Sequence, residues 1–421
     1  MVRPDRQPLP LGEAARSVAG MLLNAGFESY FAGGCVRDRL LGSEPKDYDI
    51  ATAAKPEEVK RIFPRAQGVG ESFGVMLVKH GGHVFEVATF RTDGVYSDGR
   101  RPDAVRFSSA AEDAARRDFS INGLFEEPLT GRIRDFVGGE ADLRAGVIRA
   151  IGEPSQRFAE DHLRLLRGVR FAARFGFRLD ERTAQAMREH AAKLGLIARE
   201  RIGGEVAAIL EAPTRVEAVG LLESLGLDAP VLREAGRAPL VGIAPQPIAH
   251  LGALPRMERV PLFAALAAWA LDRTGGAAGR EPAVAEAIAT AWREALLLSN
   301  RDEEGVRGVL AALAASADWE DKGVAKRKRW AASAWAPWAE RLLAVSDPDR
   351  GAAIAAWRAS VPADAIAPPP LLSGNHLIEA GFAPGPAFKS MLDLAYDAQL
   401  EGRIGSAEEA LALLRGRASA P

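Results

Sequence analysis

Two carboxylates in the stretch KDYDIAT, Asp47 and Asp49, stand on either side of Tyr48. In a strand, residues i and i+2 project from the same face, so this spacing would bring both side chains together. Like charges that close repel each other and raise the pKa of one group unless a cation lies between them. Mg²⁺ prefers carboxylate oxygens combined with substrate phosphates, so the pair predicts a divalent-metal site. The alternative is a solvated loop with two incidental acids, which the spacing alone would favour.

The residues just upstream shift the interpretation toward a metal and phosphate site. Gly33 and Gly34 follow an apolar, strand-like run and precede a short helical stretch that carries Arg37. Glycines let a backbone approach a ligand closely, N–H groups at a helix start attract anions, and Arg37 would add a positive charge for a triphosphate. A third acid, Glu86, lies in the predicted strand HVFEVATF. Apolar residues fill both faces of that strand, so Glu86 either joins the metal ligands or lies on an exposed edge.

A second group of charged residues lies in the stretch EDHLRLLRGVRFAARFGFR. Its arginines are three or four residues apart, which predicts that they share one face of a helix from Glu160: Arg164, Arg167, Arg170, Arg174 and Arg178. A solvated helix face normally alternates the two signs of charge, but no acid lies between Asp161 and Asp180. This uncompensated stripe favours contact with a nucleotide or RNA over a solvated surface.

Asp161 and Arg164, three residues apart, would be neighbours on that helix. An aspartate accepts hydrogen bonds and an arginine only donates them. Cytosine offers an amino donor beside ring acceptors, and adenine offers its N6 amino group beside N1, so both bases match such an edge. Guanine and uracil present a carbonyl and an N–H instead, which would leave polar groups unpaired or opposed. The pair is therefore predicted to accept C and A and to reject G and U.

The elements that must hold these residues differ between the two parts of the chain. The first 150 residues indicate mixed α/β structure, with helices over residues 8–25 and 56–62 and strands in FESYFAGG, YDIAT, RIRDFV and on both sides of a Gly81–Gly82 turn. Beyond that point, Ala- and Leu-rich stretches of helical period, broken by Pro and Gly, run almost to the end. The sequence therefore predicts an α+β protein with a mixed head and an all-helical remainder.

Composition narrows the class further. The chain has 421 residues and a formal net charge of −2, which predicts roughly two to four domains and neither demands nor excludes nucleic acid. No apolar run approaches the roughly 18 residues needed to cross a membrane, and the N-terminal stretch lacks the apolar core of a secretory signal. The single cysteine, Cys35, is expected to be a packing residue. These features predict a cytoplasmic protein.

Several motifs in series resemble one family. GGCVRD followed by KDYDIAT resembles the signature of the class II nucleotidyltransferases of the polymerase-β superfamily, the bacterial CCA-adding enzymes and their poly(A) polymerase relatives. RRDFSING (116–123) resembles the second motif of this family, the stretch from Glu160 its nucleotide-reading helix, and ERIGGE (200–205) the motif that braces this helix. FRTDGVYSDGRRPDAVRF (90–107) resembles the flexible loop of the head, and residues 377–404 resemble the tail that meets tRNA.

The resemblance implies a polymerase-β-like nucleotidyltransferase head followed by helical neck, body and tail. On this sequence the head would be residues 1–150, the base-recognising neck 151–215, the body 216–365 and the tRNA-binding tail 366–421. The implied reaction adds CCA to the 3′ end of tRNA without a nucleic-acid template. The RNA 3′-hydroxyl attacks the α-phosphate of CTP or ATP, and pyrophosphate leaves.

The resemblance also implies roles for individual residues. Asp47, Asp49 and Glu86 would be the catalytic residues and would hold two Mg²⁺ ions, with Mn²⁺ as an alternative. The nucleotide would be bound by one larger set: Gly33, Gly34, Arg37, Arg117, Asp161, Arg164, Arg167 and Arg170. Without the resemblance, Arg117 would be an ordinary surface arginine paired with Asp113 or Asp118. The expected partners are the tRNA 3′ end, ATP and CTP, with no membrane and no obligate protein partner.

Related activities remain as alternatives. The loop from Arg91 to Arg106 has full length, which argues against an enzyme that adds only CC but does not separate a CCA-adding enzyme from an A-adding one. A poly(A) polymerase is less favoured, because the only dense basic cluster, residues 322–330, could equally contact a tRNA backbone. A non-catalytic RNA-binding scaffold would not need the intact carboxylates and arginines.

Overall fold

A computed structural model describes residues 9–69, 73–94, 105–233 and 248–418. The chain divides into two compact units, Met1–Ile209 with Glu217–Ala235 and Leu210–Val216 with Gly236–Pro421, here called the first and second unit. The predicted division into four parts is finer than this and stays a prediction. Within the described ranges, no helix is long and apolar enough to cross a membrane.

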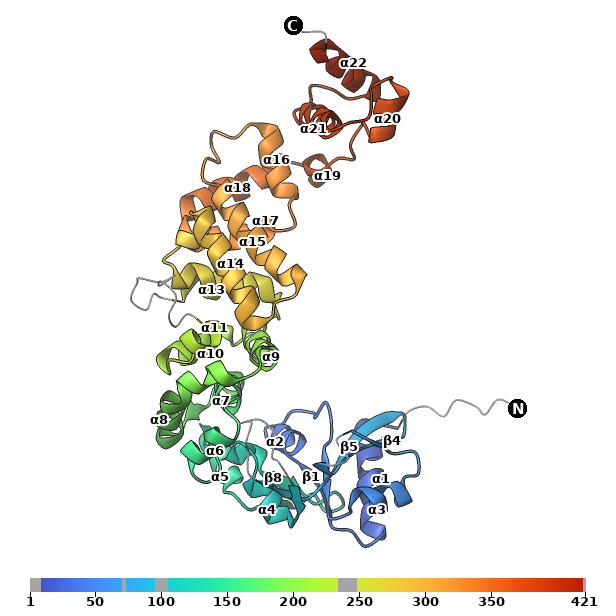
Figure 1. Cartoon of the computed structure of the whole chain (residues 1–421), viewed down its shortest axis with the longest axis vertical. Coiled ribbons are helices and arrows are strands. Elements are labelled where there is room, and N and C mark those ends of the chain that lie inside the picture. Colours follow the sequence, from blue (N-terminus) through green and yellow to red (C-terminus); the bar gives the residue numbers. More distant parts are fainter. Residues whose placement is uncertain (1–8, 70–72, 95–104, 234–247, 419–421) are drawn as a thin grey trace, which may run out of the picture. The chain divides into compact units, whose positions relative to one another are not determined.

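The first unit contains a seven-stranded sheet with the strand order β3-β4-β5-β2-β1-β8-β9 (Figure 1). All neighbouring strands in it are antiparallel except β2 and β5, which run parallel. Two smaller sheets pair β6 with β7 and β10 with β11. The strands are β1 (Ser29–Ala32), β2 (Ile50–Thr52), β3 (Gln67–Gly68), β4 (Val75–His80), β5 (His83–Thr89), β6 (Arg91–Asp93), β7 (Val105–Phe107), β8 (Leu124–Glu126), β9 (Ile133–Asp135), β10 (Val147–Ile148) and β11 (Arg178–Leu179).

Short helices connect and cover this sheet, and longer ones follow it. In chain order they are α1 (Leu11–Asn24), α2 (Gly34–Leu40), α3 (Pro56–Ile62), α4 (Ala110–Ala115), η2 (Ser120–Asn122), α5 (Gly139–Ala145), α6 (Pro154–Glu160), α7 (Arg164–Phe175), α8 (Glu181–His190), η3 (Ala191–Leu196), α9 (Arg199–Leu210), α10 (Arg215–Ser224) and α11 (Asp228–Leu232). The predicted helix over 56–62 is confirmed, with Pro56 in its first turn. The predicted hairpin is also confirmed, since Gly81 and Gly82 have φ of 58° and 88° and join β4 to β5.

One aromatic cluster fixes α4 beneath the sheet. The rings of Tyr30 and Phe125 are 5.8 Å apart edge to face, and Phe90 lies 6.3 Å from Phe125. Ala110 and Ala114 of α4 pack into the same buried cluster. Small alanine side chains let the helix approach the rings closely, so the charged residues at and beyond its C-terminus have a rigid base.

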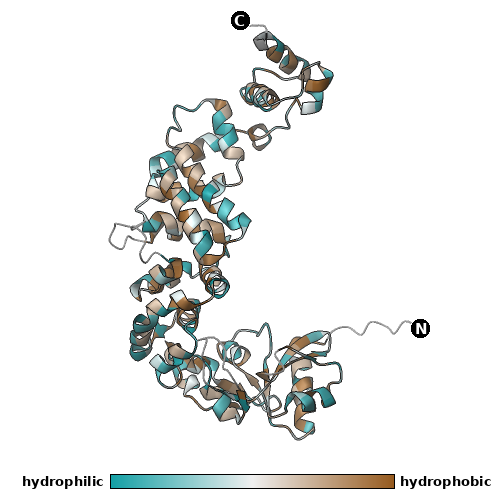
Figure 2. Ribbon diagram, viewed as in Figure 1, coloured by the Kyte–Doolittle hydropathy of each residue, from teal (hydrophilic) through white to brown (hydrophobic). Residues whose placement is uncertain are grey.

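The second unit is helical, as predicted. Its helices are α12 (Ala249–Ala253), α13 (Leu262–Arg273), η4 (Ala277–Gly279), α14 (Pro282–Leu296), α15 (Asn300–Ala315), α16 (Val324–Ala332), α17 (Ala336–Ser346), α18 (Pro348–Ser360), α19 (Ala363–Ile366), α20 (Gly374–Glu379), α21 (Ala387–Leu400) and α22 (Ala407–Ala418). Hydrophobic and hydrophilic residues are interspersed along most of them (Figure 2). α13 is the exception, because Phe263 to Asp272 are all buried, which makes it the central helix of this unit.

The last three helices share a small core of their own. Leu372, Leu377, Ala395, Ala410 and Leu414 are buried together there. Arg329 of α16 bonds this module to the preceding helices, since its Nε lies 2.6 Å from a carboxylate oxygen of Asp397 in α21. The basic cluster of residues 322–330 is therefore partly committed to an internal contact.

Candidate active site

The two aspartates lie immediately before β2 rather than within it. The Ala32 amide donates to the Asp49 carbonyl over 3.0 Å, which extends the pairing of β1 with β2 by one residue. The Tyr48 ring packs edge to face on Phe31, with ring centroids 4.9 Å apart. Tyr48 is thus held by the protein, whereas Asp47 and Asp49 are exposed. β2 begins at Ile50, two residues after the start of the predicted strand YDIAT, so neither aspartate lies within it. The charge of Asp47 still acts on Asp49, so the two carboxylates lie near each other.

Glu86 lies on the strand next to the aspartates. β5 runs parallel to β2 with Val87 opposite Ile50, so Glu86 falls beside the position of Asp49. Phe85 and Val87 point into the core, and Glu86 is exposed. The sequence alone did not determine which face of the strand carries Glu86. The exposure of Glu86 and the register of β5 against β2 show that its side chain lies on the solvent side, near the aspartates.

The pKa of Asp49 reports on this clustering of negative charge. Partial enclosure by neighbouring protein and the negative charges of Asp47 and Glu86 raise it to about 6, although the residue still reaches solvent. Such a cluster suits a divalent cation. Within the described ranges no three His, Cys, Asp or Glu side chains form a ready-made metal site. Mg²⁺ commonly takes one or two carboxylates and completes its shell with water and substrate phosphates, so these residues fit it as partial ligands.

Arg117 occupies the space beside the glycine turn. Gly33 has φ of 74°, and a Cβ added there would come within 2.7 Å of Arg117 Nη1. Glycine is therefore favoured at this position by its backbone conformation, and a larger residue would displace the Arg117 guanidinium. The positive charge of Arg117 opposes the rise in the pKa of Asp49, which places the guanidinium near the carboxylates. Arg117 also pairs with Asp113 over 3.1 Å, which confirms one of the two partners considered from the sequence, whereas its contact with the nucleotide stays a prediction.

Arg37 has internal partners instead of an open position. It is 4% exposed, its guanidinium donates to Asp38 and Asn122, and the rings of Phe171 and Phe175 lie 5.2 and 4.8 Å from its Cζ. Burial lowers its pKa against the raising effect of Asp38. The sequence did not indicate these internal partners, and the predicted contact of Arg37 with a triphosphate stays a prediction. Arg37 joins α2 to α7.

The predicted reading helix is interrupted at its start. α6 ends at Glu160 and α7 begins at Arg164, with Asp161 in an extended conformation between them. The prediction of one continuous helix from Glu160 is wrong. The reason is local: the Asp161 carboxylate accepts from the Leu163 amide over 3.0 Å, and its carbonyl accepts from the Arg164 amide over 3.1 Å. An aspartate that bonds the following backbone in this way favours a helix start over a helix interior.

Asp161 and Arg164 each have further partners. Arg201 donates to the Asp161 carboxylate from both terminal nitrogens of its guanidinium, Nη1 over 3.1 Å and Nη2 over 2.7 Å. Arg164 donates to Glu160 and to the carbonyls of Arg157 and Arg116. Arg201 belongs to the motif ERIGGE, so the expected bracing of this region by that motif is confirmed.

The prediction of an uncompensated arginine stripe is wrong. Acidic partners come from elsewhere in the chain: Arg164 pairs with Glu160, Arg167 with Asp118, Arg170 with Glu205 and Arg174 with Asp38. Arg178 lies outside the helix, in β11. Counting acids within one stretch could not detect this compensation, because most of the partners are more than thirty residues away in sequence.

Asp118 is the buried centre of these pairs. Its Oδ2 accepts from Arg167 Nε over 2.9 Å, and its Oδ1 accepts from the Asn122 side chain and the Phe119 amide over 3.0 and 2.8 Å. Burial would raise the pKa of this carboxyl, but the charge of Arg167 and the three hydrogen bonds outweigh it and lower the pKa. Because Asn122 also accepts from Arg37, a polar chain runs from α2 through Asp118 to α7.

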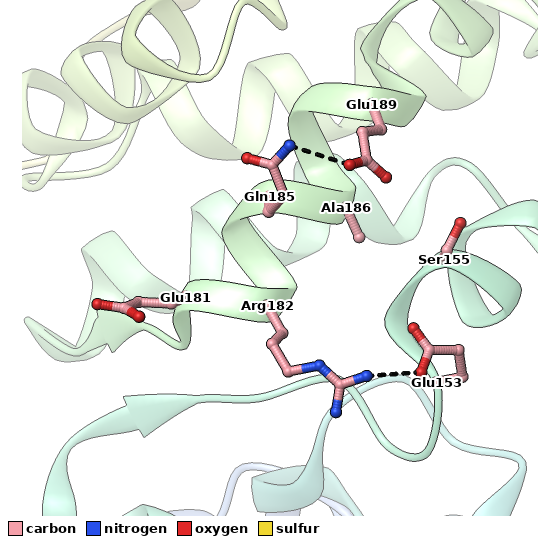
Figure 3. A pocket seen from close by; sticks show the side chains of 7 residues that line it. All are labelled: Glu153, Ser155, Glu181, Arg182, Gln185, Ala186 and Glu189. Carbon is pink, nitrogen blue, oxygen red and sulfur yellow. Dashed lines mark hydrogen bonds and ion pairs between the residues drawn. The ribbon is translucent and has the colours of Figure 1, made fainter.

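A separate hollow of about 370 Å³ lies between α6 and α8 (Figure 3). Acidic and polar side chains line it, and Arg182 bonds Glu153 across it over 2.8 Å. None of the predicted site residues contributes to its lining. This hollow is therefore separate from the carboxylates beside β2 and β5.

Exposed carboxylates beside a glycine turn, on a sheet joined to helices rich in paired arginines, are what the resemblance to the polymerase-β-type nucleotidyltransferases predicts. Comparison with known proteins agrees: residues 29–149 match the family model of the poly A polymerase head domain, and 176–237 match a probable RNA- and SrmB-binding site of polymerase A. The crystal structure of the Bacillus stearothermophilus CCA-adding enzyme in complex with CTP is similar, with 30% identity, a TM-score of 0.72 and coverage of 97% of this chain and 98% of that one. The chain belongs to the family of the CCA-adding enzymes.

Two further relatives give the extent of the similarity. The CCA-adding enzyme of Geobacillus sp. (strain WCH70) is 43% identical over 216 residues, which are 51% of this chain and 53% of the relative. The chain thus spans about half the length of the curated relatives that it matches in sequence. A Thermotoga maritima CCA-adding enzyme complexed with tRNA has the same fold, with a TM-score of 0.68, 21% identity and coverage of 96% of this chain and 94% of that one.

Several residues of the site could not be named from the sequence. Asp38, Glu160 and Glu205 hold the arginines, and Asp118 and Asn122 connect the head to α7. Asp118 and Asn122 lie in the motif RRDFSING, and this motif was the one indication in the sequence that they belong to the site. The partner of each arginine required the fold.

Replacing the buried Asp118 with Asn should destabilise the first unit. The change removes the shorter of the two carboxylate contacts of Arg167 and leaves Glu205 at 3.9 Å, and because Arg167 is 35% exposed the cost should be about 2 kcal/mol at pH 7. Because the pKa of Asp118 is lowered in the folded state, its contribution is full above its ordinary value of 3.8 and is lost as the pH falls further. Unfolding in urea, followed by circular dichroism, should therefore show a gap between wild type and Asp118→Asn that narrows toward pH 3.

The exposed Asp349 of α18 provides the control, since Asp349→Asn should change stability by less than about 0.5 kcal/mol. A constant gap between wild type and Asp118→Asn from pH 7 to pH 3 would contradict the lowered pKa.

Replacing Asp49 with Asn should make the protein more stable but inactive. Partial enclosure by protein, followed by repulsion from Asp47 and Glu86, raises the pKa of Asp49, so removing the charge should add about 1 kcal/mol above pH 6, a modest amount because solvent screens these exposed groups. The gain should vanish below the ordinary value of 3.8, where the group is neutral in both states. Melting temperatures in EDTA between pH 4 and 8 measure the effect, and a lower melting temperature at pH 8 would refute it.

Proposed function

We propose that this chain is a tRNA nucleotidyltransferase that adds CCA to the 3′ end of tRNA from CTP and ATP. The observation that carries the proposal is the cluster of Asp47, Asp49 and Glu86, which leaves negative charge exposed beside the glycine turn and Arg117. The 30% identical Bacillus stearothermophilus structure, which contains CTP, supports it over nearly the full length of both chains.

The carboxylates would hold Mg²⁺, with Mn²⁺ as an alternative. When bound there, the ions would lower the pKa of the attacking 3′-hydroxyl and neutralise charge on the triphosphate. Asp47 and Asp49 fit this role from the end of β2 and Glu86 from β5. Gly33 and Gly34 let the triphosphate approach the backbone, and Arg117 supplies a positive charge at the same place.

Asp161 and Arg164 would read the base with their remaining hydrogen-bonding capacity. A carboxylate has about four acceptor positions, and Asp161 uses three of them, for Arg201 twice and for the Leu163 amide. Arg164 uses three of its five N–H donors. One acceptor beside two donors suits the amino group and ring nitrogens of C and A. Arg167 and Arg170, held by Asp118 and Glu205, would flank the nucleotide.

The RNA partner would contact the helical remainder of the chain. The match of residues 176–237 to an RNA-binding family model and the tRNA complex of the Thermotoga maritima relative support this assignment. The tail, residues 366–421, is the proposed contact to the body of the tRNA. The single, buried Cys35 is in keeping with the reducing cytoplasm, which is the proposed location.

The test uses three tRNAs, which lack the whole CCA end, end in its first C, or end in CC. Each is incubated with CTP, with ATP and with both, and products are resolved on sequencing gels. Completion of all three is expected. Extension of only the CC-ending tRNA would mean an A-adding enzyme, arrest at CC a CC-adding enzyme, and long tails a poly(A) polymerase. Binding without extension would mean a scaffold.

Arg164→Ala should weaken the choice of base. Loss of the donors that match C and A should lower the ratio of kcat/KM for CTP over UTP by about tenfold or more. Single-nucleotide incorporation with CTP, ATP, UTP and GTP measures this ratio. Arg182→Ala, at an exposed arginine of α8, is the control and should leave it unchanged. Full discrimination in Arg164→Ala would rule out the reading role.

A further inference from the structure

One buried carboxylate of α4 binds two consecutive arginines. Asp113 is 2% exposed. Its Oδ2 accepts from Nη2 and Nε of Arg117 over 3.1 and 3.4 Å. Its Oδ1 accepts from Arg116 Nε over 2.9 Å and from the backbone amide of Arg91 over 3.3 Å. Both oxygens are therefore used, and each serves a different arginine.

The far side of Arg117 faces the glycine turn. Its Nη1 donates to the Asn122 carbonyl over 3.3 Å and takes the space where a side chain at position 33 would lie. Its Cζ lies 4.9 Å from the centre of the Phe125 ring. Asp113 thus holds one edge of the guanidinium, the ring covers its face, and the opposite edge is presented at Gly33.

The base of this arrangement is rigid. Ala110 and Ala114, on either side of Asp113 in α4, pack into the aromatic cluster beneath the sheet. Ser109 caps the helix, accepting from the Glu112 amide, and Glu112 bonds back to the Ser109 amide. A carboxylate on such a helix can fix a long side chain that would otherwise keep its rotamer freedom.

We propose that Asp113 is a positioning residue that holds Arg117 beside the glycine turn for the incoming nucleotide and keeps it from the neighbouring carboxylates. Asp47, Asp49 and Glu86 are exposed acids that would attract an untethered guanidinium. An arginine paired with them would occupy the place of a cation and leave the triphosphate without its contact. This inference rests on the proposed function and deepens it.

The same segment also holds the base reader. The carbonyl of Arg116, next to Arg117, accepts from both Arg157 and Arg164, and the carbonyl of Ala115 accepts from Arg157. These carbonyls lie at the C-terminal end of α4, where cations are favoured. The chain therefore connects the arginine at the triphosphate and the arginine at the base through two adjacent residues that Asp113 anchors.

A double-mutant cycle tests the proposal. Asp113→Asn, Arg117→Ala and the double variant are compared with wild type for CTP addition to a tRNA lacking CCA, with kcat and KM measured separately. Asp113→Asn should lower kcat/KM about tenfold, mainly through KM, because a charge-assisted contact is misplaced. Since Asp113 acts through Arg117, the double variant should lose no more than Arg117→Ala alone. CTP binding by calorimetry should follow the same pattern.

Glu112→Gln, in the same helix, is the matched control and should leave kcat/KM and CTP binding close to wild type. Losses that multiply in the double variant would overturn the inference, as would a Glu112→Gln loss equal to that of Asp113→Asn. If Asp113→Asn does not fold, the cycle is run with Asp113→Glu, which keeps the charge but shifts the arginine, and the same two results decide. A wild type that adds no nucleotide would overturn the proposed function, whereas multiplying losses in an active wild type overturn the inference alone.

Discussion

The ion pair between the buried Asp118 and the partly exposed Arg167 is the interaction on which the first unit depends. A buried carboxylate is costly unless its hydrogen-bonding positions are filled, and Asp118 fills them with Arg167, Asn122 and a backbone amide. Asn122 passes the connection to Arg37 and so to the glycine turn. A shift of α7 relative to the sheet would break this chain of contacts, so the geometry between α2, the sheet and α7 is held by polar groups with defined directions.

The carboxylates beside β2 differ from Asp118 because they lie next to each other. Around Asp118, opposite charges are matched and the pKa is lowered, whereas at Asp49 like charges accumulate and the pKa is raised to about 6. The fold thus pairs the buried Asp118 with a cation and leaves the exposed Asp49 among like charges. Stability accounts for the first arrangement. The second makes sense only if a cation arrives from outside, which is why the unmatched cluster is the stronger indicator of function.

The sequence could predict what depends on local chemistry. Pro56 starts a helix, Gly81 and Gly82 turn a hairpin, and Gly33 permits a conformation with positive φ, all through the properties of the residue itself. The prediction of unpaired arginines was wrong because their charges are neutralised by acids that only the tertiary fold brings close, such as Asp38 in α2 and Glu205 in α9. The prediction of one unbroken helix was wrong because hydrophobic and charge periodicity does not show that the Asp161 side chain accepts a hydrogen bond from the Leu163 amide and so ends the regular helix there. Which face Glu86 takes required the register of β5 against β2.

The arginines of this site can be ion-paired with carboxylates and still bind a nucleotide as proposed. A surface salt bridge contributes little to stability, but an arginine with one edge bound to a fixed carboxylate presents its other edge in a fixed direction. Arg117 on Asp113, Arg167 on Asp118 and Arg170 on Glu205 all have this form. Because the acids already fix the arginine side chains, less conformational entropy would be lost when an anion binds to them. The negative charge of the acids also weakens the positive electrostatic potential around the arginines. For the proposed reading of two different bases in one geometry, fixed direction would contribute more than added charge, which would account for the pairing of these arginines.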